Sequence, residues 1–154
     1  MLSNGQREML RGQGTMLGRM LIGLLFFFSG VGIIVNGPAT TTLYFESLNI
    51  PLAALATYLV LILKIAAGGM LIVGYRVGVA SGALIIFTLL TTLIAHLNIN
   101  DDNLFKNLAI VGGLLYVMAY GAGEGWQYTG SDPMAKVMTP TDDPPTNTTR
   151  NVRY

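Results

Sequence analysis

A single lysine lies in the middle of an otherwise apolar stretch, "ALATYLVLILKIAAGGMLIVGY", residues 54–75. The ammonium group of Lys64 can hold an anion or an electronegative oxygen. At the centre of a membrane-spanning helix, however, a lysine costs about 2.5–3.5 kcal/mol on insertion scales. Four interpretations follow: the side chain reaches the headgroup layer, bonds neutral acceptors such as Thr57 or Tyr75, meets a carboxylate of another subunit, or holds an anionic ligand.

The face on which Lys64 lies favours an inward position. Thr57, Gly68 and Tyr75 are seven residues before, four after and eleven after Lys64, which places them on one side of a helix. A hydroxyl, a backbone dent and a phenol are unlike a uniformly apolar lipid face. We therefore expect Lys64 to point into the bundle and to stay charged because a partner's carboxylate or a bound ligand meets it.

A second set of polar residues follows one face of a later apolar run. Ser81, Thr88, Thr92 and His96 are spaced by seven, four and four residues. Such hydroxyls commonly bond the carbonyl one turn back or a neighbouring helix. The alternative is a polar lane for a quinone head group, a proton or a small anion, with His96 as its titrating member.

Two tyrosines one turn apart, Tyr116 and Tyr120, follow in the last apolar run. They supply either hydroxyls to such a site or an aromatic belt at the membrane interface. The candidate ligand or partner contacts are therefore Lys64, Thr88, Thr92, His96, Tyr116 and Tyr120, and no residue can be named as catalytic.

Several classes of chemistry are excluded by composition. The chain has no cysteine and one histidine among 154 residues, so thiolate chemistry, a structural metal site and a bis-histidine haem are not expected. No Ser, His and acid constellation suggests a nucleophile. The net charge of +1 gives no basic footprint for nucleic acid.

The elements that carry these residues are membrane helices. Apolar residues make up 52% of the chain and charged residues 11%, against roughly 25% charged in a typical soluble domain. Crossing the bilayer takes roughly 20 apolar residues as a helix. Four runs qualify: residues 18–37, 52–75, 77–97 and 104–123. The segment between the first two, residues 38–51, is expected to be a loop. The sequence thus predicts an all-α, integral membrane four-helix bundle.

Small residues should let these helices approach each other. Gly68 and Gly69 are adjacent in the second run, and two pairs with small-xxx-small spacing follow, Gly78 with Gly82 and Ala109 with Gly113.

The distribution of charge predicts the orientation. Arg7, Arg11, Arg19 and Arg76 flank one side of the predicted spans, whereas Glu46, Asp101 and Asp102 lie on the other side with Lys106. By the positive-inside rule both termini are cytoplasmic.

Three segments are expected along the chain: an N-terminal cytoplasmic or interfacial segment at 1–17, the transmembrane domain at 18–125, and a tail at 126–154. Gly5, Gly12 and Gly14 argue against a firm helix in the first. The tail is rich in Thr, Pro and Asp without an apolar period, which predicts flexibility. It could instead order on a partner protein through Trp126, Tyr128 and Tyr154.

Several stretches resemble the DoxX family of four-helix prokaryotic membrane proteins: "GRMLIGLLFFFSGVGII", "AAGGMLIVGYR", the "AHL" that closes the third run, and "FKNLAIVGGLLYVMAYGAG". The last carries Phe105, Lys106, Asn107, Gly112, Gly113 and Gly121 in the family's order. The resemblance covers residues 18 to about 125. Lys64 departs from it, because the family often has a carboxylate near that position, and so does "GAGEGWQYTG" at the end of the domain.

The resemblance implies a compact bundle in the prokaryotic cytoplasmic membrane with both ends inside, and a link to quinone-dependent thiosulfate oxidation. We therefore expect a multi-pass subunit of a membrane redox complex that has no evident cofactor of its own, with quinone as the cofactor that the resemblance implies. Its expected partners are the lipid bilayer and other membrane subunits, and electrons would be handled mainly by a partner. The alternatives are a structural or assembly subunit of a larger respiratory or photosynthetic complex and, third, a channel for a small anion or a quinone.

Overall fold

The computed structural model describes residues 3–95 and 101–123, with only the backbone described for residues 4–11. Within these residues every regular element is a helix: α1 (Asn4–Val35), α2 (Pro38–Ser47), α3 (Ala53–Val73), α4 (Val77–Ala95) and α5 (Asp102–Tyr120). All but α2 contain a run long and apolar enough to cross a membrane, which in α1 covers Gly12–Val35. The prediction of an all-α membrane protein with four spans is confirmed.

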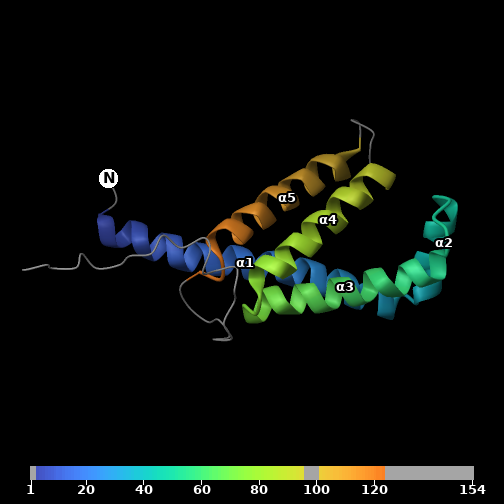
Figure 1. Ribbon diagram of the computed structural model, residues 1–154, viewed down its shortest axis with the longest axis horizontal. Coiled ribbons are helices and arrows are strands. Elements are labelled where there is room, and N and C mark those ends of the chain that lie inside the picture. The colour runs from blue at the N-terminus through green and yellow to red at the C-terminus, as the bar shows by residue number, and fades with distance from the viewer. Residues whose placement is uncertain (1–2, 96–100, 124–154) are drawn as a thin grey trace, which may run out of the picture.

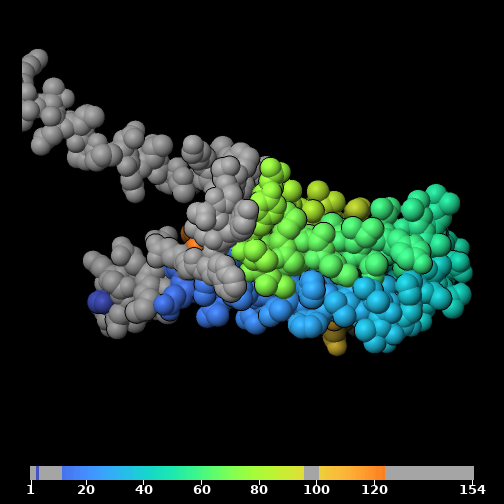
Figure 2. All heavy atoms as spheres, turned by 90° about the horizontal axis from the view of Figure 1, so that it is seen from below, coloured from blue at the N-terminus to red at the C-terminus, as the bar shows by residue number. Residues whose placement is uncertain are grey.

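The four long helices pack as two pairs. Successive long helices run in opposite directions, and α1 packs mainly on α3 while α4 packs mainly on α5. The pairs meet near the turn between α3 and α4, and they diverge toward α2 (Figure 1). We call these the turn end and the α2 end. Viewed from the side, α1 and α3 lie against each other along their length, and α2 covers their end (Figure 2).

The apolar core lies closer to the turn end. It contains Phe26, Ala67, Leu71, Val77, Ala80, Leu84, Leu114 and Val117, so each of the four long helices contributes to it. Phe26 of α1 also meets Phe87 of α4 edge to face, with ring centroids 6.5 Å apart. These contacts fix the two helix pairs where they meet.

The structure corrects the prediction of a loop at residues 38–51. Residues 38–47 form α2, which begins with Pro38, a residue suited to the first helical turn because its amide has no hydrogen to satisfy. Thr42 links α2 to α3, since its hydroxyl lies 3.0 Å from the hydroxyl of Thr57. The helix lies across the end of α1 and α3 (Figure 1).

Helix α1 is continuous from Asn4, although Gly12 and Gly14 lie within it. The expectation that glycines would prevent a firm helix here is therefore wrong. A glycine costs a helix only about 1 kcal/mol relative to alanine, and tertiary contact supports this part of α1. The chain after α5 returns to it, because a Cβ on Gly123 would lie 2.9 Å from the carbonyl oxygen of Gly12.

One face of α1 is buried at helical spacing. The buried residues are Gly12, Thr15, Arg19, Gly23, Phe26, Gly30 and Ile33. At Gly23 the backbones of α1 and α3 touch: a Cβ there would lie 2.9 Å from the carbonyl oxygen of Gly68, and one on Gly68 would lie 2.7 Å from the amide nitrogen of Phe27. Gly68 is thus a packing residue, as its spacing indicated. Gly82 is not at such a contact, since a Cβ there would meet nothing within 4 Å.

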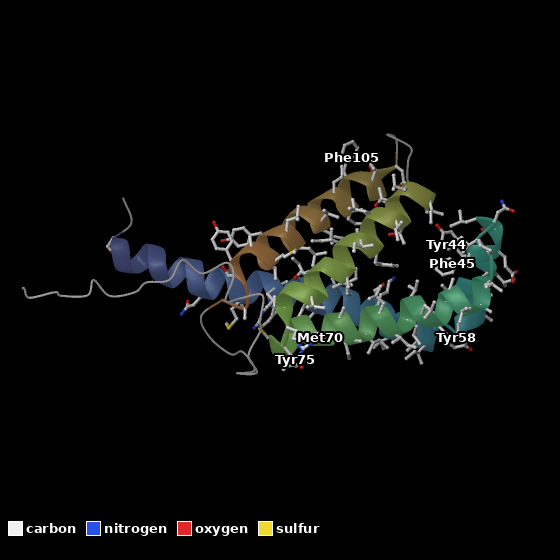
Figure 3. All side chains as sticks on the ribbon, in the orientation of Figure 1. Tyr44, Phe45, Tyr58, Met70, Tyr75 and Phe105 are labelled. Atoms are coloured by element: carbon white, nitrogen blue, oxygen red, sulfur yellow. The ribbon has the colours of Figure 1, made fainter. Side chains whose placement is uncertain are left out.

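Aromatic side chains mark both ends of the spans. Tyr44, Tyr58 and Phe105 lie toward the α2 end and Tyr75 toward the turn end (Figure 3). Each is exposed, as amphipathic or bulky rings are at membrane interfaces. The apolar side chains exposed between them face lipid, and the protein is a multi-pass membrane protein.

Candidate functional site

Lys64 points between three helices. Its Nζ donates a hydrogen bond of 2.9 Å to Oγ of Ser29 on α1, and it lies 5.5 Å from the ring centroid of Phe87 on α4. The ammonium group therefore bridges α1 and α3 and approaches α4. These contacts lie on the side of α3 that the stripe indicated, but the hydrogen bond is exposed and its acceptor is a neutral hydroxyl.

The acceptor is not one of the residues that the sequence suggested. Thr57 is fully buried, and its hydroxyl already has two partners: the hydroxyl of Thr42 on α2 at 3.0 Å and the carbonyl oxygen of Ala53 on α3 at 2.9 Å. Tyr75 lies eleven residues further along, at the turn end. Ser29 is the acceptor instead. It is the only serine within the first apolar run, residues 18–37.

Hydrogen-bond donors exceed acceptors around Lys64. An ammonium group has three N–H donors, and Ser29 accepts one. In the part of the chain that the structure describes, no carboxylate or other acceptor takes the remaining two. The hydroxyl of Ser29 also makes no bond to the carbonyl one turn back, unlike Thr57, Thr88 and Thr92.

The excess donors lie deep within the span. Lys64 is 11 residues after Ala53, which is about 17 Å along the helix at 1.5 Å per residue. Its side chain is half-buried, and Ser29 is exposed. A ligand can therefore reach this pair from the lipid side without first opening the bundle.

The polar stripe on α4 has a different geometry. Thr88 and Thr92 are buried, and their hydroxyls each donate a 2.7 Å hydrogen bond to the carbonyl oxygen four residues earlier. The Nδ2 of Asn107 on α5 donates to Oγ1 of Thr92 at 3.0 Å. These are the local and interhelical bonds of the packing interpretation, and they join α4 to α5 near the α2 end.

Ser81 continues the stripe toward the core. It is fully buried, and its hydroxyl has no hydrogen-bond partner among residues 3–95 and 101–123. His96, the proposed titrating member, lies outside the described residues.

The tyrosines of α5 face away from the bundle. The rings of Tyr116 and Tyr120 lie against each other with centroids 4.4 Å apart, and both are about half exposed. Their position fits an interfacial aromatic belt, and they do not join Lys64. The tail anchors Trp126, Tyr128 and Tyr154 lie outside the described residues.

Two residues near Lys64 were missed by sequence reasoning. Ser29 interrupts the apolar run "GLLFFFSGVGIIV" as Lys64 interrupts its own run, and pairing the two interruptions would have suggested the contact. Phe87 gave no such signal, because it is one apolar residue among many. Arg19 is a third surprise: it was assigned to the basic flank but is fully buried on the packed face of α1.

Side chains that could bind a metal do not gather. Within the described ranges, no group of three or more His, Cys, Asp or Glu side chains could hold an ion. The arrangement around Lys64 instead suits an uncharged or anionic ligand that offers oxygen acceptors.

Comparison with known proteins bears on the chain as a whole. No curated protein and no solved structure matches the sequence. A family model, DoxX, matches residues 14–97, more than half of the chain. The match spans α1 from Gly14 through α4 and thus contains Ser29, Lys64 and Phe87, whereas the α5 motif from Phe105 to Gly121 lies beyond it. The chain belongs to the DoxX family.

Proposed function

We propose that this protein is a membrane subunit of a redox complex and that Lys64, with Ser29 and Phe87, binds the head group of a quinone. We further propose the prokaryotic cytoplasmic membrane as its location, with both termini on the cytoplasmic side. The single observation that carries the proposal is the excess of hydrogen-bond donors around Lys64 at the depth of the hydrocarbon core. Unused donors at this depth are costly, and a ligand with oxygen acceptors satisfies them.

The chemistry of the three residues fits a quinone head group. Its carbonyl oxygens accept hydrogen bonds, which Lys64 and Ser29 can donate. Its flat ring suits a position beside Phe87, whose own ring already packs against Phe26 and is held in place. Since Ser29 is exposed, an isoprenoid tail can remain among the lipid chains while the head group reaches the ammonium.

A small aqueous anion fits less well. It would have to leave water and cross apolar surface to reach Lys64, which lies about 17 Å from the start of α3. A quinone already resides in the bilayer and carries its acceptors with it. The depth of Lys64 therefore favours the quinone over the anion.

A bound quinone supplies the two-electron, two-proton chemistry of such a complex. The chain's own residues contribute binding and orientation: Lys64 donates hydrogen bonds and holds a proton at Nζ, and Ser29 fixes the direction of the ammonium. With no cysteine and a single histidine in its sequence, the chain offers few residues that could ligate an electron carrier. Electrons are therefore assigned to a partner subunit.

Quinone content measures this proposal directly. The protein is purified from its native membrane in mild detergent, and quinone per protein is determined after solvent extraction, together with the copurifying proteins. Lys64→Met should lower bound quinone about tenfold or more, because hydrogen bonds to charged groups contribute roughly 1.5–3 kcal/mol. Lys106→Met is the matched control, since Lys106 is exposed at the start of α5 and bonds only Asn103 among the described residues.

Two results would contradict the proposal. One is wild-type protein that copurifies with redox partners but without quinone. The other is equal quinone content in the Lys64→Met and Lys106→Met variants. Thermal unfolding of the detergent-solubilised variants shows whether any loss of quinone comes from misfolding.

One observation favours a second function, that of a structural subunit. Only 11% of the membrane-spanning stretch of α5 is buried within the protein, compared with 39% of that of α4. Its outer face therefore remains open to another membrane protein. Stoichiometric recovery in a larger complex, with crosslinks to α5 and no bound quinone, would favour this function over the first.

A further inference from the structure

The lipid-facing side of α3 has a groove near the turn end. Its volume is about 450 Å³, it is wide open, and the described residues that line it are Gly69, Met70, Val73 and Tyr75. Met70 and Tyr75 lie near the turn end of α3 (Figure 3). The lining is mainly apolar, and three of these four residues belong to the predicted span of α3. The surrounding medium of such a groove is the hydrocarbon of the bilayer.

The groove depends on Gly69, which does not lie at a contact between helices. A Cβ on Gly69 would meet nothing within 4 Å, whereas a Cβ on the preceding Gly68 would collide with the backbone of α1. The two adjacent glycines thus serve different faces of α3. Gly68 admits α1, and Gly69 leaves space toward lipid.

A cation lies beside Tyr75, one of the residues that line the groove. Arg76 follows Tyr75 in the turn between α3 and α4, is exposed, and has its guanidinium carbon 5.8 Å from the centroid of the Tyr75 ring. The carboxylates whose side chains the structure describes, Glu46, Asp101 and Asp102, belong to α2 and the start of α5, at the opposite end of the spans. Arg76 therefore presents its charge to the interface without a competing acid beside it in the turn.

We propose that this groove binds an anionic phospholipid, with an acyl chain along Gly69, Met70 and Val73 and the phosphate at Arg76. A planar guanidinium offers parallel N–H donors to phosphate oxygens, and the phenol of Tyr75 lies where a head group meets the hydrocarbon. The proposal rests on the groove and its cation, and it is independent of the quinone at Lys64.

Native mass spectrometry of the purified protein tests the proposal. The protein in mild detergent is mixed with phosphatidylglycerol or phosphatidylethanolamine of identical acyl chains. Phosphatidylglycerol should be retained more strongly, and Arg76→Gln should reduce its retention about fivefold, the scale expected for one arginine near an anionic surface. Retention of phosphatidylethanolamine should change little in this variant.

Filling the groove tests the acyl-chain part of the site. Gly69→Leu should reduce retention of both lipids, whereas Gly112→Leu is a matched control, because Gly112 also faces open space but lies on α5. Lys106→Gln controls for loss of an exposed cation. Inorganic phosphate should not displace the bound lipid.

Equal retention of the two lipids, or an Arg76→Gln variant that keeps phosphatidylglycerol as the wild type does, would overturn the proposal. Displacement by inorganic phosphate would do the same. If Gly69→Leu fails to fold, the Arg76→Gln comparison alone decides.

Discussion

Lys64 and Ser81 show two ways in which a polar side chain can occupy an apolar bundle. Lys64 donates one exposed hydrogen bond to Ser29, and its other donors have no acceptor among the described residues. Ser81 is enclosed in the core region with its hydroxyl unpartnered among the described residues. The first arrangement suits a ligand, and the second is a cost of about 1–3 kcal/mol to the fold.

Ser81→Ala should therefore leave stability unchanged or raise it by about 1 kcal/mol, because it removes a buried hydroxyl that lacks a partner. Thr92→Val should lower stability by about 0.6 kcal/mol or more, since it breaks the bond from Asn107 of α5. Thermal unfolding in detergent measures both variants. A Ser81→Ala variant that folds normally but loses quinone-linked turnover would contradict the packing interpretation and restore the polar lane.

At the scale of helices, contact between α1 and α3 is decided by glycines. Three of them lie on this contact, Gly23 and Gly30 on α1 and Gly68 on α3. Gly68 could be predicted as a dent from the double glycine in an apolar run. Gly23 and Gly30 could not, because a glycine's role depends on which face of its helix meets a neighbour, and α1 has glycines on several faces.

Gly68→Ala should separate α1 from α3 and destabilise the protein by about 1–3 kcal/mol, the usual cost of overpacking. The reason is steric: the new Cβ would lie 2.7 Å from the backbone nitrogen of Phe27, which cannot move alone. Gly69→Ala is the adjacent control and should be tolerated, because the space beside it is open. Urea or thermal unfolding of both variants checks this, and equal destabilisation would show that the helices do not meet at Gly68.

The element boundaries illustrate what sequence can and cannot specify in a membrane protein. The spans followed from length and apolarity alone, and the observed helices agree with them to within a few residues except at the start of α1. Helix α2 was missed because helices were sought by membrane-spanning length, and α2 has only 10 residues. In the structure the Thr40 hydroxyl bonds the carbonyl oxygen of Asn36 just before α2, and the Thr42 hydroxyl bonds that of Pro38 and lies beside the Thr57 hydroxyl. The side of α3 on which Lys64 lies followed from helical spacing. Its exposed bond to Ser29, 35 residues away in the chain, could not be predicted because it depends on the packing of α1 on α3.

For the whole molecule, the remaining prediction is orientation. The basic residues Arg19 and Arg76 lie toward the turn end, and Glu46, Asp101 and Asp102 lie toward the α2 end. The positive-inside rule predicts that the turn end faces the cytoplasm.

Single-cysteine labelling measures this orientation in a chain that has no cysteine of its own. Asp101→Cys should react with an impermeant maleimide in intact cells, whereas Arg76→Cys and Arg150→Cys should react only after the membrane is permeabilised. The reverse pattern would invert the proposed topology while leaving the fold as it is.

The central claim is that Lys64 and Ser29 hold a quinone head group between the two helix pairs. Photoaffinity labelling of native membranes with an azidoquinone, followed by peptide mapping, tests it most directly. The account predicts label on α1 near Ser29, on α3 near Lys64 and on α4 near Phe87, with loss of label when unlabelled quinone competes and in the Lys64→Met variant. Label confined to the outer face of α5, or unaffected by competing quinone and by Lys64→Met, would contradict it.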